Sequence, residues 1–237
     1  MTPDPAAYRD AVVAGEATLE DAAAAARACQ ACRLWQRGTQ TVFGAGPGAT
    51  ARVVLVGEQP GDREDLTGQP FVGPAGRLLD DALDEAGIDR HTAYLTNVVK
   101  HFSWEQRGKR RIHKKPKADE IRACRPWLEA ELAALKPELV VCLGATAAQA
   151  VLGRTFRVTQ GRGVIVESAL APRVLATVHP SSILRAPDSE TREQEFKRFV
   201  ADLHVAAEAL TTPRAKPGPR PQVAPTSPAR RRRPISG

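Results

Sequence analysis

The sequence predicts an α/β fold: a three-layer α/β/α sandwich with a mostly parallel central sheet. Short runs rich in Val and Leu alternate along the chain with longer segments of helical pattern. Unbroken apolar runs are expected of strands that are covered on both faces, and regular alternation of strand and helix is typical of a parallel sheet. We therefore expect helices on both sides of one central sheet.

Five segments fit buried strands, and the gaps between them leave room for helices. The predicted strands are RVVLVG at 52–57, AYLTNVV at 93–99, ELVVCLG at 138–144, GVIVE at 163–167 and RVLATV at 173–178.

The segments around these strands fit helices. Residues 74–86 begin with a proline at a first-turn position, which helices tolerate. Residues 118–135 contain Pro126, which should kink that helix or divide it in two. Further helices are expected at 145–152, directly after the third strand, and from about 189 to 210.

The net charge of +7 comes from the end of the chain. Residues 211–237 contain seven cations, no acid and seven of the 19 prolines, so residues 1–210 carry a formal charge of zero. A segment of this composition cannot bury enough apolar surface to offset the entropy lost on ordering. We expect a folded domain at 1–210 and a disordered, basic tail rich in Pro and Arg at 211–237.

The sequence shows no membrane or export segment. No stretch approaches the roughly 20 apolar residues that span a bilayer, and the N-terminal MTPDPAAYRD lacks the basic and apolar regions of a secretory signal. These observations predict a cytoplasmic protein that does not bind membranes. Nothing in the sequence points beyond a monomer.

A basic segment, KHFSWEQRGKRRIHKKPK, lies at residues 100–117. It holds eight cations and one acid within the otherwise neutral domain. A local cluster of cations favours contact with a polyanion such as nucleic acid. A solvated charged loop is the alternative interpretation, so other residues must decide between the two.

Polar motifs follow the predicted strands at the points where the strands end. In open α/β sheets, ligands bind outside the carboxyl ends of the strands. The motifs are GEQPGDRED after the first strand, the basic segment after the second, GATA after the third and HPSSILR after the last. We expect one edge of the sheet to gather Glu58, Gln59, Asn97, His101, His113 and His179.

The four cysteines suggest a metal site. Cysteines spaced as Cys29 and Cys32 are, in a cytoplasmic protein, more typical of metal binding or redox chemistry than of a disulfide. Cys142 lies within a predicted buried strand, where a free cysteine behaves as a small apolar residue. His101 follows a strand end, and imidazole can replace a thiolate at an iron–sulfur cluster. This favours Cys29, Cys32, His101 and Cys124 as ligands over a set that contains Cys142, with zinc and iron–sulfur both open.

Several long motifs resemble the iron–sulfur uracil-DNA glycosylases of the uracil-DNA glycosylase superfamily. The similarity covers about residues 27–205, and GEQPG combined with KRRIH resembles one branch, UdgX, more than the others. It implies a [4Fe–4S] cluster that is structural or supports DNA binding. His101 takes the place of a cysteine that follows the NVVK motif in the turnover branches. The motifs are GEQPG at 57–61, GQPFVGPAGRLL at 68–79, YLTNVVK at 94–100, ACRPWL at 123–128 and HPSSILR at 179–185.

The resemblance also assigns residues to the recognition of a flipped uracil. An enzyme that acts on a base must take it out of the stack and hold it in a pocket. Phe71 would stack on the base, and the Asn97 amide would accept from N3–H and donate to O4. His179 would stabilise the departing uracil anion at O2. Ser181 would contact the phosphodiester, and Leu184 or Arg185 would fill the gap left in the strand.

His113 and Gln59 determine what happens after uracil leaves. A glutamine amide cannot act as a general base, so attack by water on the sugar is handicapped. A neutral imidazole is a competent nucleophile, and His113 can then capture C1′ of the sugar as a covalent adduct. Glu58 would orient the imidazole.

Charged neighbours would support this step. Cations such as Arg111 are expected to bind DNA and to disfavour protonation of His113. Asp62 and Asp65 are weaker candidates that could contact the substrate or shape the loop.

The sequence therefore predicts a UdgX-type uracil-DNA glycosylase that acts on uracil-containing DNA, including single strands. One alternative is a conventional turnover iron–sulfur glycosylase that forms no adduct. The other is a non-enzymatic, zinc-stabilised module that binds nucleic acid.

Overall fold

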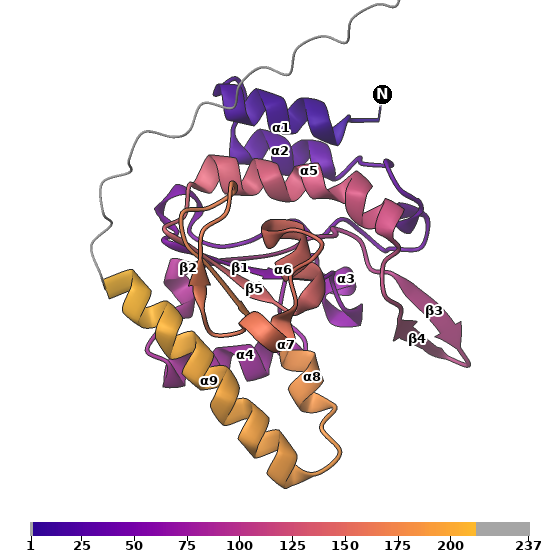
Figure 1. Ribbon diagram of the computed structural model, residues 1–237. Helices are drawn as coiled ribbons and strands as arrows, with labels where there is room; N and C mark the ends of the chain where they lie inside the picture. The colour runs from indigo at the N-terminus through magenta and orange to yellow at the C-terminus, as the bar shows by residue number, and fades with distance from the viewer. Residues whose placement is uncertain (1, 212–237) are drawn as a thin grey trace, which may run out of the picture.

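The computed structural model describes residues 2–211 and contains one central sheet of five strands in the order β2-β1-β5-β7-β6 (Figure 1). The first four strands are parallel, and β6 is antiparallel to β7. The predicted α/β class with a mostly parallel sheet is confirmed. The strands are β1 (Val53–Gly57), β2 (Ala93–Asn97), β5 (Leu139–Leu143), β6 (Ile165–Val166) and β7 (Val174–Thr177).

Alternate residues of each strand enter two separate apolar cores, one on each face of the sheet. In β1, Val54 and Val56 pack against α5 and α6, whereas Val53 and Leu55 pack against α4 and α9. The first face includes α1 (Pro5–Ala14), α2 (Leu19–Ala26), α5 (Ala118–Leu135) and α6 (Ala145–Leu152). The second includes α4 (Pro74–Glu85), α8 (Pro180–Leu184) and α9 (Ser189–Thr211).

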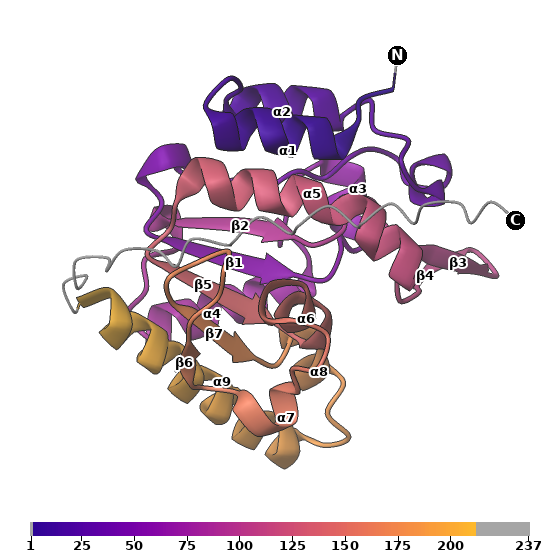
Figure 2. The same cartoon turned by 45° about the horizontal axis from the view of Figure 1, so that its top comes forward.

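The helices α1 and α2 form an outer layer on α5, as Figure 2 shows. Tyr8 of α1 contacts Trp127 of α5 with a ring-centroid distance of 5.6 Å. The helix α5 is continuous through Pro126, so the predicted alternative of two separate helices is wrong. Two short helices, α3 (Asp62–Thr67) and α7 (Val158–Gly161), complete the fold.

The basic segment contains a β-hairpin where the sequence predicts a loop. Strand β3 (Trp104–Arg107) pairs with β4 (Arg110–His113) around Gly108, which has a positive φ of 58°. The hairpin forms its own two-stranded sheet beside the central one. Its strands carry mostly charged or polar side chains, so the apolar alternation that reveals a strand is missing from the sequence.

One cation of the basic segment is buried. The Lys100 ammonium is 2.6 Å from a carboxylate oxygen of Glu131, and it donates to the Thr96 hydroxyl and to the Asn97 main-chain carbonyl. Glu131, on α5, also accepts hydrogen bonds from the Tyr94 hydroxyl and from the Gly44 amide. Lys100 therefore ties the end of β2 to α5 and is not available to bind DNA.

The predicted tail lies outside the described residues from position 212 onward. The boundary predicted at residue 210 stays a prediction, since α9 runs to Thr211. Within residues 2–211, the structure has no helix of the length and hydropathy needed to cross a membrane.

We predict that Lys100→Met lowers the free energy of unfolding by about 3–5 kcal/mol, because it leaves the Glu131 carboxylate buried without its cation. Urea denaturation of both proteins measures the difference. Lys197→Met is the matched control, because Lys197 forms an exposed pair with Glu193 and its loss should leave stability unchanged. An equal, small effect of both substitutions would contradict the prediction.

Candidate active site

The ends of β1 and β2 place two predicted base-binding residues side by side. Gly57 and Asn97 are register partners in these adjacent parallel strands. A Cβ atom on Gly57 would lie 2.3 Å from the Asn97 Oδ1 atom and 2.7 Å from the Phe71 ring. The amide and the ring therefore lie directly over the Gly57 backbone, and only glycine leaves space for both.

Phe71 holds a strained backbone conformation at this point. Its φ is 57°, in the left-handed region that residues with a side chain seldom adopt. Its carbonyl lies against Gly76 of α4, where a Cβ would approach the oxygen to 1.8 Å. Such strain costs on the order of 1 kcal/mol, persists only when the surroundings impose it, and is frequent at functional sites.

His179 follows β7 and lies beside Phe71, with 6.1 Å between the ring centroids. Its Nδ1 accepts a hydrogen bond from the Ser181 amide and lies 2.8 Å from the Ser181 hydroxyl. Burial, reinforced by His113 and Arg185, lowers the pKa of His179 to about 4. At neutral pH the ring is uncharged and, because Nδ1 is an acceptor, the proton is on Nε2. His179 thus presents one N–H donor.

His113 is the last residue of β4 and stands beside Glu58. The His113 Nε2 atom is 3.7 Å from a carboxylate oxygen of Glu58, and half of the His113 side chain is exposed. Burial is the largest influence that lowers the pKa of His113; Arg185 lowers it further and Glu58 opposes both. The expected lowering of this pKa is present, but Arg185 is the cation that contributes, in place of the sequence neighbours such as Arg111.

Thr146 is a site residue that the sequence analysis did not identify. Its hydroxyl donates to the Glu58 carboxylate from the first turn of α6. The motif GATA, at the end of the third predicted strand, was the available signal. Thr146 and His113 thus contact the same carboxylate from two different elements.

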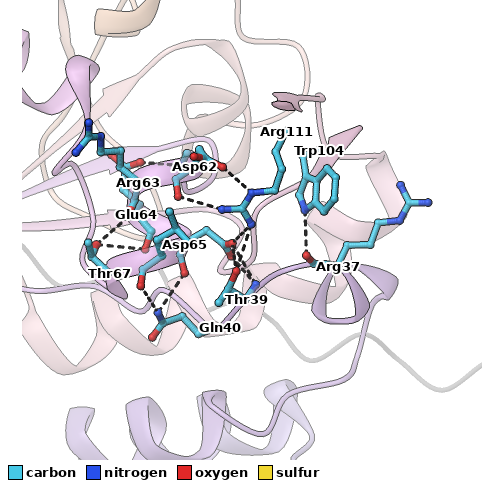
Figure 3. A network of polar contacts seen from close by, with 12 residues as sticks. Arg37, Thr39, Gln40, Asp62, Arg63, Glu64, Asp65, Thr67, Trp104 and Arg111 are labelled. Atoms are coloured by element: carbon cyan, nitrogen blue, oxygen red, sulfur yellow. Dashed lines mark hydrogen bonds and ion pairs between the residues drawn. The ribbon is translucent and has the colours of Figure 1, made fainter. Parts of the chain in front are cut away.

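Arg111, Asp62 and Asp65 bind one another (Figure 3). The Arg111 guanidinium lies 2.6 Å from a carboxylate oxygen of Asp62 and 2.6 Å from one of Asp65. Asp65 is fully buried and also accepts from the amide and the hydroxyl of Thr39. These contacts attach the hairpin to α3. The substrate contacts that we expect of the three residues stay predictions.

Gln59 anchors both ends of the hairpin. Its amide nitrogen donates to the main-chain carbonyls of Ser103 and Lys114, at 3.2 and 3.0 Å, and its amide oxygen accepts from the Ser103 amide at 2.9 Å. The side chain is buried, and all of these contacts are to the main chain. Gln59 therefore positions the strand that ends at His113, in addition to being unable to act as a base.

Three of the cysteines form a group and the fourth lies apart. The Cys29 sulfur accepts from the Trp127 indole N–H, and the Cys124 sulfur accepts from the Lys100 amide. Burial, opposed by Lys100 and aided slightly by the nearby thiols of Cys32 and Cys29, raises the pKa of Cys124 to about 12. For Cys142, in the middle of β5, burial alone raises the pKa.

His101 is buried and directly follows Lys100, whose amide donates to the Cys124 sulfur. Its Nε2 is 3.0 Å from the Thr41 hydroxyl, and burial lowers its pKa to about 4, which leaves the ring neutral. In the part of the chain that the structure describes, no three side chains of His, Cys, Asp or Glu are arranged to bind a single metal ion.

Residues 43–204 match the uracil-DNA glycosylase superfamily. The chain belongs to this superfamily. It is 36% identical to the Type-4 uracil-DNA glycosylase of Thermotoga maritima over 188 residues, which cover 79% of this chain and 91% of that protein. The Type-4 uracil-DNA glycosylase of Archaeoglobus fulgidus is 34% identical over 190 residues, which cover 77% of this chain and 92% of that protein.

A Type-5 uracil-DNA glycosylase of Pyrobaculum aerophilum is 33% identical over 56% of this chain and 62% of that protein. The predicted resemblance is thus confirmed for the superfamily, within which the UdgX branch stays a prediction.

We predict that Gln59→Glu loosens the hairpin of this superfamily member, because it replaces two N–H donors by a carboxylate that faces two carbonyl oxygens. Hydrogen exchange of the amides at 103–114 should accelerate on the order of tenfold or more. Gln106→Glu is the control, since Gln106 lies exposed on the same hairpin and its amide makes only one hydrogen bond, to the Gly108 carbonyl, which is exposed to water. Unchanged exchange in Gln59→Glu would show that the amide does not anchor the hairpin.

Proposed function

We propose that this protein excises uracil from DNA and that His113 then captures C1′ of the sugar as a covalent adduct. One observation carries the proposal: the Glu58 carboxylate lies 3.7 Å from the His113 Nε2 and accepts from Thr146, and a Cβ on Gly144, two residues before Thr146, would lie 3.1 Å from His179. A nucleophilic imidazole and an N–H donor therefore approach the same region from the hairpin and from the central sheet. Superfamily membership and the named Type-4 relatives support the first step.

Excision uses the residues over Gly57. The flipped base stacks on Phe71, and Asn97 accepts from N3–H and donates to O4 of uracil. As the bond between N1 and C1′ breaks, its electron pair stays on uracil and positive charge develops on the sugar. The Nε2–H of His179 donates to O2 and stabilises the uracil anion.

Capture uses the imidazole of His113. A neutral ring attacks C1′ through an unprotonated nitrogen, so a C1′–N bond replaces the C1′–N1 bond. The ring becomes cationic, and the Glu58 carboxylate, held by Thr146, stabilises that charge until the ring loses a proton to water. Gln59 offers no base that could activate water instead.

We also propose that Cys29, Cys32, Cys124 and His101 hold a [4Fe–4S] cluster. Buried thiols that influence one another and a buried neutral imidazole fit such a group, and two of the sulfurs already accept N–H hydrogen bonds. When bound, the cluster would cross-link the segment after α2 to α5 and to the end of β2. The reaction itself is performed by the residues described above.

The substrate is proposed to be uracil-containing DNA, including single strands. The hairpin cations Lys109 and Arg110 are exposed and would contact phosphates. Lys100 and Arg111, which the sequence groups with them, are held in the ion pairs described above.

Incubation with single-stranded DNA that contains one deoxyuridine should give a shifted band that survives SDS on a denaturing gel. His113→Ala should abolish the band, because the nucleophile is lost, whereas His204→Ala, an exposed histidine on α9, should leave it intact. Abasic DNA without a shifted band would mean a turnover glycosylase. Unreacted DNA would favour the non-enzymatic module.

The rate of adduct formation should stay constant from pH 8 down to about 6.5 and decline only below that pH. Both His113 and His179 have lowered pKa values, so protonation removes the nucleophile and the neutral donor only in acid. Glu58→Gln removes the carboxylate that raises the pKa of His113, which should move this decline to lower pH. Single-turnover gels across the pH range measure it, and a decline centred above 6.5 would contradict a neutral nucleophile.

A further inference from the structure

We propose that Trp35, with Arg33 and Arg37, forms a stacking platform for the single strand that flanks the target nucleotide. This surface, the Trp35 platform, rests on the proposed function and adds to it a second DNA contact away from the base-binding residues. Its ligand is an unpaired nucleotide, with the base on the indole and the phosphates on the guanidinium groups.

The local structure turns Trp35 outward. Residues Arg33–Gln36 form one short 3-10 turn after Cys32. Leu34 of this turn is buried in the core, which leaves Trp35 with 38% of its surface exposed. Among residues 2–211, no other Trp, Tyr or Phe side chain is exposed. An exposed indole offers a flat surface on which any base can stack.

The charge around Trp35 favours nucleic acid over an apolar partner. Arg33 and Arg37 are both exposed, and neither forms an ion pair within the part of the chain that the structure describes. Exposed cations two residues before and two residues after an exposed aromatic residue fit proteins that bind single strands by stacking and by phosphate contacts, without reading their sequence. A protein partner that covers Trp35 would have to leave both arginines without counterions or supply acids for them.

The platform is continuous with the hairpin. The Trp104 indole on β3 donates to the Arg37 carbonyl at 3.0 Å, and Arg111 on β4 donates to the Thr39 hydroxyl at 3.2 Å. Figure 3 shows the Arg37 guanidinium directed away from the Asp65 network. The exposed cations Lys109 and Arg110 lie on the same hairpin, so basic side chains extend from the platform onto the element that ends at His113.

A binding experiment tests the platform without any chemistry. The probe is a fluorescein-labelled oligothymidylate free of uracil, and anisotropy gives its dissociation constant at several salt concentrations. Trp35→Ala should weaken binding about tenfold, and Trp35→Phe should weaken it less because it keeps a ring. The double variant Arg33→Ala/Arg37→Ala should reduce the slope of log K against log salt by about 1.4.

Matched controls remove an exposed side chain elsewhere. Val13 of α1 is 67% exposed, and Arg154 lies exposed beyond the carboxyl end of α6. Val13→Ala and Arg154→Ala should leave binding and its salt dependence unchanged. Equal effects of the controls and the platform variants would overturn the platform.

An excision experiment determines whether the strand on the 5′ side or on the 3′ side of the deoxyuridine contacts Trp35. Two substrates carry deoxyuridine near the 5′ end or near the 3′ end, so each lacks one flank. In the wild type, removal of the flank that lies on Trp35 should lower the rate at limiting substrate about tenfold, and Trp35→Ala should be insensitive to that same truncation. If both proteins release uracil but the truncation slows the wild type and Trp35→Ala equally, or slows neither, the platform is overturned. Failure of the wild type to release uracil overturns the proposed function instead.

Discussion

The buried ion pair between Lys100 and Glu131 fixes the point at which the sheet ends and the site begins. Two charges out of water are costly, and here each has several hydrogen-bond partners that offset the loss of hydration. The Lys100 ammonium binds the Asn97 carbonyl, and its own amide donates to Cys124. Lys100 therefore positions Asn97 at the end of β2, Cys124 of the cysteine group and the start of the hairpin.

From this point the chain enters the hairpin. Strand β3 leads away from the central sheet, and strand β4 returns toward it and ends at His113. Gln59 holds the two ends, Arg111 attaches one strand to α3, and Trp104 attaches the other to the segment after α2. The hairpin cations thus differ in their surroundings: Arg111 holds the element in place, whereas Lys109 and Arg110 are exposed and are proposed to contact phosphates. The proposed role of His113 depends on this attachment, because a nucleophile must be held close to the reacting carbon.

Much of the fold and part of the site could be predicted from local sequence. Strands buried on both faces appear as apolar runs. The carboxyl ends of parallel strands must meet at one edge of the sheet, and this rule predicts that Asn97 and His179 lie at the same edge. The remainder depends on partners distant in sequence. Lys100 counts as one more cation until Glu131 is placed beside it, and Gln59 appears as a missing base until its contacts with Ser103 and Lys114 are known. The hairpin has no apolar alternation, and nothing local distinguishes Trp35 from a core aromatic.

The hairpin shares no backbone ladder with the central sheet. Side-chain contacts alone join it to the rest of the domain along most of its length, so it is a separable module in the architectural sense. In the proposed function, Asn97 and His179 at the ends of two strands would bind and release the base, whereas His113, which would form the bond to the sugar, lies on this separate element. A hairpin that pairs with no other strand can change in length or sequence without breaking a backbone hydrogen bond of the central sheet, so the proposed capture and the proposed base recognition rest on structurally independent elements.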